Sequence, residues 1–229
     1  TPLFLASWEG KSNTVRLLIE NGADISITRY DGRTALIRAC AEGHTEVAAL
    51  LIEKESDINR KDNLGQSALF SACHGGKADS VKFLMEKGAD INTADRDGWT
   101  GLHTACDGGY TEIAQLLMEK GLDINRIDNF SQTPVYLACR EGKTQLVQLL
   151  VENDADVSIA EEDGWAPLHV ACVQGHADIA ALLAERWADI NRMDNAGKTP
   201  LYLACWKGKV DVVKLLIEND ADVSIADDD

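Results

Sequence analysis

Apolar and polar positions follow one pattern along the whole chain, with a period of 33 residues. In each period a short apolar segment ends at a Gly, and a second segment follows it. The second segment has apolar residues at positions i, i+1, i+3 and i+4, as in Val47, Ala48, Leu50 and Leu51. This spacing places apolar side chains on one face of an amphipathic helix. The pattern therefore predicts two helices in every period.

The polar residues of each period predict where these helices begin and end. Thr or Ser, often followed by Pro, stands before the first helix, where a hydroxyl can cap the chain and Pro loses no hydrogen bond. We expect this helix to run as from Thr133 to Glu141 and to stop at the recurrent Gly, which tolerates left-handed backbone. An acid such as Glu46 or Glu112 opens the second helix. A short extended piece and a polar turn then predict a hairpin loop.

Seven periods align without an insertion or a deletion, and they predict a single array over residues 1–229. Gly, Asp and Cys recur in fixed columns, and one of these columns contains all six cysteines. The repeats are residues 1–33, 34–66, 67–99, 100–132, 133–165, 166–198 and 199–229.

The first helix of several repeats carries a known signature, in the segments TPLFLA (1–6), TGLHTA (100–105), TPVYLA (133–138), APLHVA (166–171) and TPLYLA (199–204). With its period, the chain resembles the ankyrin repeats, whose signature is a 33-residue unit with Thr-Pro-Leu-His-x-Ala. The resemblance covers the whole chain. It implies an all-α repeat solenoid of seven stacked repeats, each an ankyrin-type helix-turn-helix plus β-hairpin loop. The helix-end Gly of the family is replaced here by Glu55, Asp154, Trp187 and Asp220, where we expect modest local strain.

A second pattern repeats every 66 residues. The segment NDADVSIA occurs at 153–160 and at 219–226, and INRKDN (58–63), INRIDN (124–129) and INRMDN (190–195) share the same spacing. Odd repeats therefore resemble odd repeats, and even repeats resemble even repeats. This indicates growth by duplication, or construction, from a two-repeat block.

Charge and cysteine usage narrow the classes of partner and compartment. The net charge of −16 opposes binding to nucleic acid, and no apolar run reaches the ~18 residues of a membrane helix. Stacked helices lie ~8–10 Å apart, whereas a disulfide needs Cα atoms within ~4.4–6.8 Å. We therefore expect buried free thiols and an intracellular location, in the reducing environment of the cytoplasm.

The spacing of His and Cys raises the question of metal binding or catalysis. His103 and Cys106, like His169 and Cys172, lie one helical turn apart, as two metal ligands can. The favoured interpretation is that the cysteines pack in the core and the histidines hold the turn. Because no nucleophile elbow, phosphate loop or paired carboxylates occur, the sequence predicts a protein that is not an enzyme and requires no cofactor.

The resemblance implies a scaffold that binds another protein through the hairpin tips and the concave face. Trp and Arg, which dominate the energetics of many interfaces, are frequent at these positions. For Trp99 and Trp165 the alternative is packing against the neighbouring hairpin, and the two interpretations remain equally open. The candidate partner-binding residues are Trp8, Tyr30, Arg33, Leu64, Arg96, Trp99, Phe130, Arg140, Trp165 and Trp206.

The alternative function is the binding of calcium by acidic hairpin loops. Neighbouring hairpins ~10 Å apart could share an ion between carboxylates, since Ca–O bonds are ~2.4 Å. Asp is also a common turn residue, so a solvated acidic face is the favoured interpretation of the same residues. The candidate ligands are Asp62, Asp95, Asp97, Asp128, Glu161, Asp163, Asp194 and Asp227.

The first and last repeats each lack a neighbour on one side. The last repeat keeps apolar helices, and we expect Leu203, Val212, Leu215 and Leu216 to meet water there. This predicts end-to-end self-stacking of copies at high concentration, opposed by the net charge.

Overall fold

The computed structural model describes residues 1–186 and 188–225. Trp187 and Asp227, which carry two of the predictions above, lie outside these residues. The chain divides into two compact units, Thr1–Leu122 and Asp123–Asp229.

Fourteen α-helices form within the described residues, two in each predicted repeat, and this confirms the all-α repeat fold. No helix among them is long and apolar enough to cross a membrane. The helices are α1 (Pro2–Trp8), α2 (Ser12–Glu20), α3 (Ala35–Glu42), α4 (Thr45–Glu53), α5 (Ala68–His74), α6 (Ala78–Glu86), α7 (Gly101–Gly108), α8 (Thr111–Glu119), α9 (Pro134–Arg140), α10 (Thr144–Glu152), α11 (Pro167–Gln174), α12 (Ala177–Arg186), α13 (Pro200–Trp206) and α14 (Val210–Glu218).

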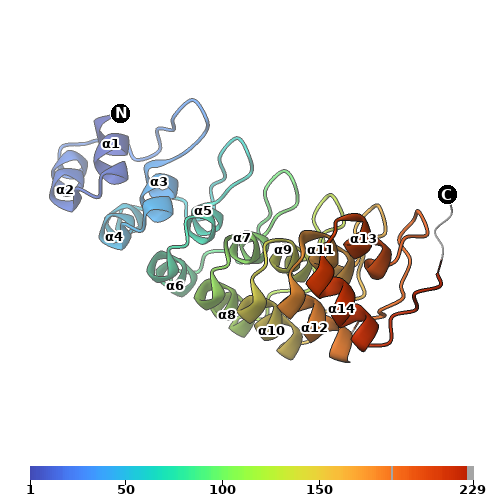
Figure 1. Ribbon diagram of the computed structural model, residues 1–229. Helices are drawn as coiled ribbons and strands as arrows, with labels where there is room; N and C mark the ends of the chain where they lie inside the picture. Colours follow the sequence, from blue (N-terminus) through green and yellow to red (C-terminus); the bar gives the residue numbers. More distant parts are fainter. Residues whose placement is uncertain (187, 226–229) are drawn as a thin grey trace. The chain divides into compact units, whose positions relative to one another are not determined.

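The first unit stacks its helices in two layers. The first helices of successive repeats pack on one another, α1 on α3, α3 on α5 and α5 on α7, and the second helices α2, α4, α6 and α8 do the same. The loops that follow α2, α4 and α6 project on the side of the first helices (Figure 1). These loops therefore lie beside one another along one edge of the unit.

The second unit has the same construction. Helices α9, α11 and α13 pack in one layer, and α10, α12 and α14 pack in the other. The loops in the described residues fold back as hairpins without forming a strand, and an isolated antiparallel bridge joins Ala94 to Thr100 in the first unit. Each hairpin closes on main-chain bonds such as that from Asp194 N to Lys198 O, at 3.0 Å.

The predicted caps hold the first helices. The hydroxyls of Thr1, Thr34, Ser67, Thr100, Thr133 and Thr199 each accept a hydrogen bond from the amide three residues later. Ala166 has no hydroxyl, and the imidazole of His169 accepts the hydrogen bond of the Ala166 amide at 3.2 Å. The His of the signature therefore supports the start of its own helix.

The predicted left-handed positions are also present. The Gly column has positive φ in all seven repeats, at Gly10, Gly43, Gly76, Gly109, Gly142, Gly175 and Gly208. Glu55, Asp154 and Asp220 have φ of 65°, 66° and 63°, as expected for residues that replace the helix-end Gly. Ser131, with φ of 60°, is a further non-Gly residue of this kind, in a loop where other repeats have Gly.

One column of the first helices, with Leu or Val in every repeat, forms the core. Leu3, Leu36, Leu69, Leu102, Val135, Leu168 and Leu201 are all buried. The cysteine column is buried from Cys40 to Cys172, but Cys205 is exposed, so the prediction for this residue is wrong. Within the first unit, Cys73 packs close to Gly101 at the start of the next first helix, α7. No described helix follows α13 and α14 to cover Cys205 in the same way.

The apolar residues predicted to meet water in the last repeat are mostly buried. Leu203, Val212 and Leu216 are at most 1% exposed, and Leu215 is half-buried, so the prediction of a bare face at these positions is wrong. These side chains pack within the α13–α14 pair and against the preceding repeat. The large exposed apolar residues of the two helices are Trp206, Val210 and Ile217. These buried residues therefore give no support to end-to-end stacking of copies, which stays a prediction.

Candidate interaction surface

One acidic residue shapes each hairpin loop. In the loop of the second repeat, a carboxylate oxygen of Asp62 accepts the amide hydrogens of Leu64 and Gln66, both at 2.9 Å. Asp128 and Asp194 hold their loops in the same way, and all three are buried. These carboxylates are therefore occupied by the turns that they stabilise.

Neighbouring loops are joined side by side. The Nε of Arg33 donates to the second oxygen of Asp62 at 3.2 Å, and the indole N–H of Trp165 donates to Asp194 at 2.9 Å. Main-chain bonds add to these, as from Asn195 N to Asp163 O at 3.0 Å. Arg33 and Trp165 thus connect consecutive loops. Trp165 thus packs against the neighbouring loop, while its half-exposed ring leaves the interface interpretation a prediction.

Several predicted contact residues remain in water on the loop side of each unit. In each unit we use the term loop-side surface for the hairpin tips and the exposed positions of the first helices beside them. Tyr30 is 84% exposed and Trp206 is 65% exposed, and the tips of later loops present apolar side chains as well. Leu64, Arg96 and Phe130 are the exposed candidates at these tips.

A groove of about 500 Å3 opens on the loop-side surface of the second unit. Its aromatic lining comes from Trp165, Tyr202 and Trp206, and we call it the aromatic groove. Two cations border its rings, with Lys198 Nζ 5.6 Å from the Tyr202 ring and Lys207 Nζ 4.0 Å from the Trp206 ring. The groove therefore combines flat apolar surface with charges of both signs, because Asp163 and Asp194 also line it.

A second hollow, of about 400 Å3, lies between α3 and α5 in the first unit, and we call it the basic cleft. Its lining includes three cationic side chains, those of Arg33, Arg38 and Lys77. The carboxylate of Glu42 also belongs to the lining. The Arg38 guanidinium stacks on Trp8, 4.2 Å from the ring centre, and bonds Glu42 at 2.7 Å. Trp8, 37% exposed, is thus partly covered by Arg38.

The remaining partner-binding candidates have neighbours within their own units. The Trp99 ring stacks with His103 at a centroid distance of 6.3 Å. Arg140 donates to Glu141 at 2.8 Å and to Gln132 at 3.3 Å. The two residues lie at the edge of the loop-side surface and are half-buried, so they present less surface than Trp206.

The structure does not bring the calcium candidates together. The described residues contain no group of three or more His, Cys, Asp or Glu side chains placed to hold a metal ion. Asp95 and Glu161 accept amide hydrogens of their own turns, as the other loop acids do. Burial raises the pKa of Asp95. Asp97 and Asp163 are exposed at the tips.

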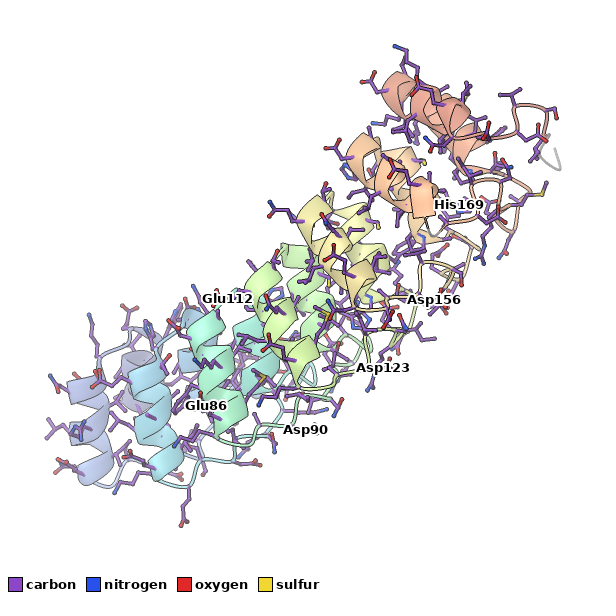
Figure 2. All side chains as sticks on the ribbon, turned by 90° about the horizontal axis from the view of Figure 1, so that it is seen from below. Glu86, Asp90, Glu112, Asp123, Asp156 and His169 are labelled. Atoms are coloured by element: carbon purple, nitrogen blue, oxygen red, sulfur yellow. The ribbon has the colours of Figure 1, made fainter. Side chains whose placement is uncertain are left out.

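The His and Cys residues are held as structural groups. His103 and His169 are fully buried, and His169 Nε2 lies 3.0 Å from the carbonyl oxygen of Arg192 (Figure 2). Burial lowers the pKa of His169, and it raises the pKa of Cys40 and Cys73 to about 12. A thiol of this kind is a poor nucleophile, because the thiolate is the reactive form. This environment fits core packing.

Three columns stabilise the repeats in a way that sequence reasoning missed. The recurrent Asp after each second helix accepts the amide two residues later, as Asp90 does from Asn92 and Asp156 does from Ser158 (Figure 2). In alternate repeats an Asn, such as Asn59 or Asn125, accepts the amide of the next such Asp. The imidazoles of His44 and His176 reach main-chain carbonyls of the preceding repeat. The Asn column and the His column, which has Tyr110 between its two histidines, recur every 66 residues, so the 66-residue pattern was the sequence signal that could have revealed them.

The comparisons with known proteins agree with this geometry. A family model described as "Ankyrin repeats (3 copies)" matches residues 1–62, 56–128, 93–161 and 136–227, which together span nearly the whole chain. The chain belongs to the ankyrin repeat family. Ankyrin repeats are in general modules for protein–protein interaction, and their fold is typically a non-enzymatic scaffold.

A solved structure extends the likeness to the level of the fold. The crystal structure of the human ASB11 ankyrin repeat domain is 27% identical in sequence, with a TM-score of 0.86. The match covers 98% of this chain and 100% of that one. No curated protein matches. The ankyrin fold is therefore shown, and the partner has to be sought from the surface of this chain.

Proposed function

We propose that this ankyrin repeat protein is a non-enzymatic scaffold that binds another protein through its loop-side surface. The observation that carries the proposal is the aromatic groove, where Trp165, Tyr202 and Trp206 line one hollow. Trp and Tyr are among the residues that contribute most to the binding energy of protein interfaces. The groove thus offers an anchor site for a partner.

The way in which the groove is held supports this function. Trp165 is fixed by its bond to Asp194, and α13 carries Tyr202 and Trp206 on a rigid helix. A preformed surface loses little conformational entropy on binding, which favours affinity. Trp206, at 65% exposed, has much apolar area left to bury. We therefore infer that Trp206 is the principal anchor.

The chemistry of the core supports a binding role over catalysis. The described His and Cys pairs of the signature are buried. The thiols of Cys40 and Cys73, with pKa values raised to about 12, are not activated. Buried free thiols also suit a reducing compartment, which supports the inference that the protein works inside the cell.

The test is a selection of binders from a displayed protein library on the intact chain, followed by affinity measurements on variants. We expect selected binders to lose about tenfold or more in affinity for Trp206→Ala, the range of an interface hot spot. Ile217→Ala is the matched control, because Ile217 of α14 is exposed but does not line the groove. Binders that lose affinity for Ile217→Ala and keep it for Trp206→Ala would contradict the proposal.

A further inference from the structure

The basic cleft of the first unit has a chemistry that the aromatic groove lacks. It lies between α3 and α5 and is lined by polar side chains, among them Arg33, Arg38, Ser71 and Lys77. Three of these four are cationic, and Glu42 is the carboxylate of the lining. Asp62, which pairs with Arg33, adds a second carboxylate, so three cations and two carboxylates leave the cleft a net charge of +1 in a chain whose net charge is −16. The position of the cleft on the loop-side surface makes it accessible to a partner.

Two residues that line this cleft each carry a buried polar atom without a hydrogen-bond partner among the described residues. These atoms are the hydroxyl oxygen of Ser71 and the Nε of Arg38. The Ser71 residue is 7% exposed and lines the cleft. An unsatisfied buried polar group costs about 1–3 kcal/mol, so native proteins rarely retain one without a reason. Because arginine Nε can only donate, the missing partner of Arg38 is an acceptor.

The cationic groups are already held in position. Arg38 bonds Glu42 through a terminal nitrogen at 2.7 Å and stacks on Trp8, so its Nε edge is fixed. Arg33 is tied to Asp62 at 3.2 Å and to Gln66 at 3.4 Å. The stem of Lys77 packs close to Gly43, where an added Cβ would lie 3.1 Å from it. A ligand that enters the cleft therefore meets donors that need little reordering.

We propose that the basic cleft binds a carboxylate side chain from an acidic peptide segment of the protein partner. This inference rests on the proposed scaffold function and assigns the partner one chemical feature. A carboxylate has two oxygens, enough to accept from Arg38 Nε and from the Ser71 hydroxyl together. Arg33 and Arg38 are paired with Asp62 and Glu42, so the cleft keeps a net charge of one positive unit, that of Lys77. A singly charged carboxylate neutralises this charge, whereas a doubly charged phosphate leaves an excess of negative charge beside Glu42. A glutamate or aspartate of the partner thus fits the cleft better than a phosphorylated residue.

The direct test is an NMR titration of the intact, isotope-labelled chain with N-acetyl-glutamate methylamide as the probe. We expect saturable shifts of the Arg38 Nε–Hε signal and of the Ser71 amide signal. The uncharged N-acetyl-glutamine methylamide should shift neither signal at the same concentrations. Inorganic phosphate, the third probe, should act only at higher concentrations than the glutamate probe.

Four variants separate recognition from stability. Ser71→Ala should weaken binding of the glutamate probe severalfold, yet leave or raise the melting temperature, because it removes an unsatisfied hydroxyl. Arg38→Gln should weaken binding about tenfold, the size expected for a charge-assisted hydrogen bond. Arg16→Gln is the matched control, since Arg16 is exposed on α2 and does not line the cleft. Glu42→Gln should strengthen binding, because it removes the competing carboxylate.

Each other outcome overturns the assignment. Equal shifts with the glutamate and glutamine probes, or none with either, would mean that the cleft does not recognise an anion. Tighter binding of phosphate would replace the carboxylate by a phosphorylated residue. A loss for Arg16→Gln equal to that for Arg38→Gln would reduce the effect to net charge. If binders are selected through Trp206 but the cleft gives no shifts, the cleft assignment fails and the scaffold function stands.

Discussion

At the scale of single residues, the loops depend on buried acceptors and the core depends on buried neutral groups. Each loop acid, such as Asp194, satisfies main-chain amides of its own turn and, in alternate repeats, a side chain of the preceding loop. His169 and Cys40 lie in the interior, where burial disfavours their charged forms. Single changes at these positions should therefore have effects that exposed neighbours do not show.

Asp194→Ala should lower the free energy of unfolding by about 2–3 kcal/mol, since it removes the acceptor of two amides and of the Trp165 indole. Denaturant unfolding measures the change. Asp163→Ala, at an exposed position of the preceding loop, is the control, and we expect an effect within about 0.5 kcal/mol. Equal losses for the two variants would contradict the structural role of the buried acid.

The stability should fall as the pH decreases below about 6.5, the ordinary pKa of histidine. Burial lowers the pKa of His169, so the unfolded chain takes up a proton at a higher pH than the folded chain does. His169 therefore contributes its full stability above the unfolded pKa and loses it as the pH falls through the folded pKa.

Unfolding free energies measured between pH 7.5 and pH 5 test this dependence. His169→Gln, which keeps an acceptor three residues into the helix, should reduce the slope in this range. A slope that is the same in the wild type and in His169→Gln would show that His169 is not its source.

Brief alkylation of the native protein should modify Cys205 before any other cysteine. Cys205 is exposed, whereas the other five cysteines are buried, and burial raises the pKa of Cys40 and Cys73 to about 12. Mass spectrometry of the labelled peptides measures the order, and the protein unfolded in denaturant is the control in which all six should react. Fast labelling of Cys139 in the native protein would contradict the packing of the core.

At the scale of the element, each repeat is held by its cap, its helix-end Gly and its contacts with the next repeat. The 66-residue period has a physical basis here. In alternate repeats a ring, His44, Tyr110 or His176, lies against the Gly that ends a first helix in the preceding repeat. A Cβ at Gly142 would lie 2.7 Å from the His176 ring, so a side chain there is excluded.

Gly142→Ala should therefore destabilise the protein more than Gly208→Ala. Both residues have nearly the same backbone, with φ of 68° and 65°, so the cost of left-handed alanine, about 1 kcal/mol, is shared. Nothing lies within 4 Å of a Cβ added at Gly208, whereas the His176 ring meets one at Gly142. Thermal or denaturant unfolding of the two variants gives the difference. Equal destabilisation of the two variants would contradict a role for the ring contact. If the ring contact is the cause of the difference, the further substitution His176→Ala should restore part of the stability that Gly142→Ala loses.

Repeat period and capping chemistry were enough to predict the helices, because each local preference agreed with the packing of the next repeat. From the sequence alone, a Trp at position 165 could bind a partner or connect neighbouring loops, because either role is served by the same aromatic ring. The sequence also placed Leu203 and Leu216 in water, because periodicity identifies an apolar face without telling which neighbour covers it. The basic cleft was invisible for a similar reason, as Arg38 and Ser71 belong to different repeats and meet only in the fold.

At the scale of the whole molecule, stability and recognition occupy different positions of the same repeat. The columns of Leu, Cys and recurrent Asp face the core or the turns and vary little from repeat to repeat. The loop-side positions differ among repeats, from Tyr30 and Leu64 to Phe130 and Trp206. A repeated scaffold with a varied surface is what a protein-binding module requires.

The measurement that tests this account most directly is hydrogen exchange of the intact chain, alone and saturated with a binder selected from the displayed library. We predict slower exchange on binding in the loops at 161–165 and 194–198 and in α13, which together form the aromatic groove. Helices α12 and α14 should exchange at unchanged rates. Protection confined to α12 and α14, with the loops and α13 unaffected, would contradict recognition through the loop-side surface.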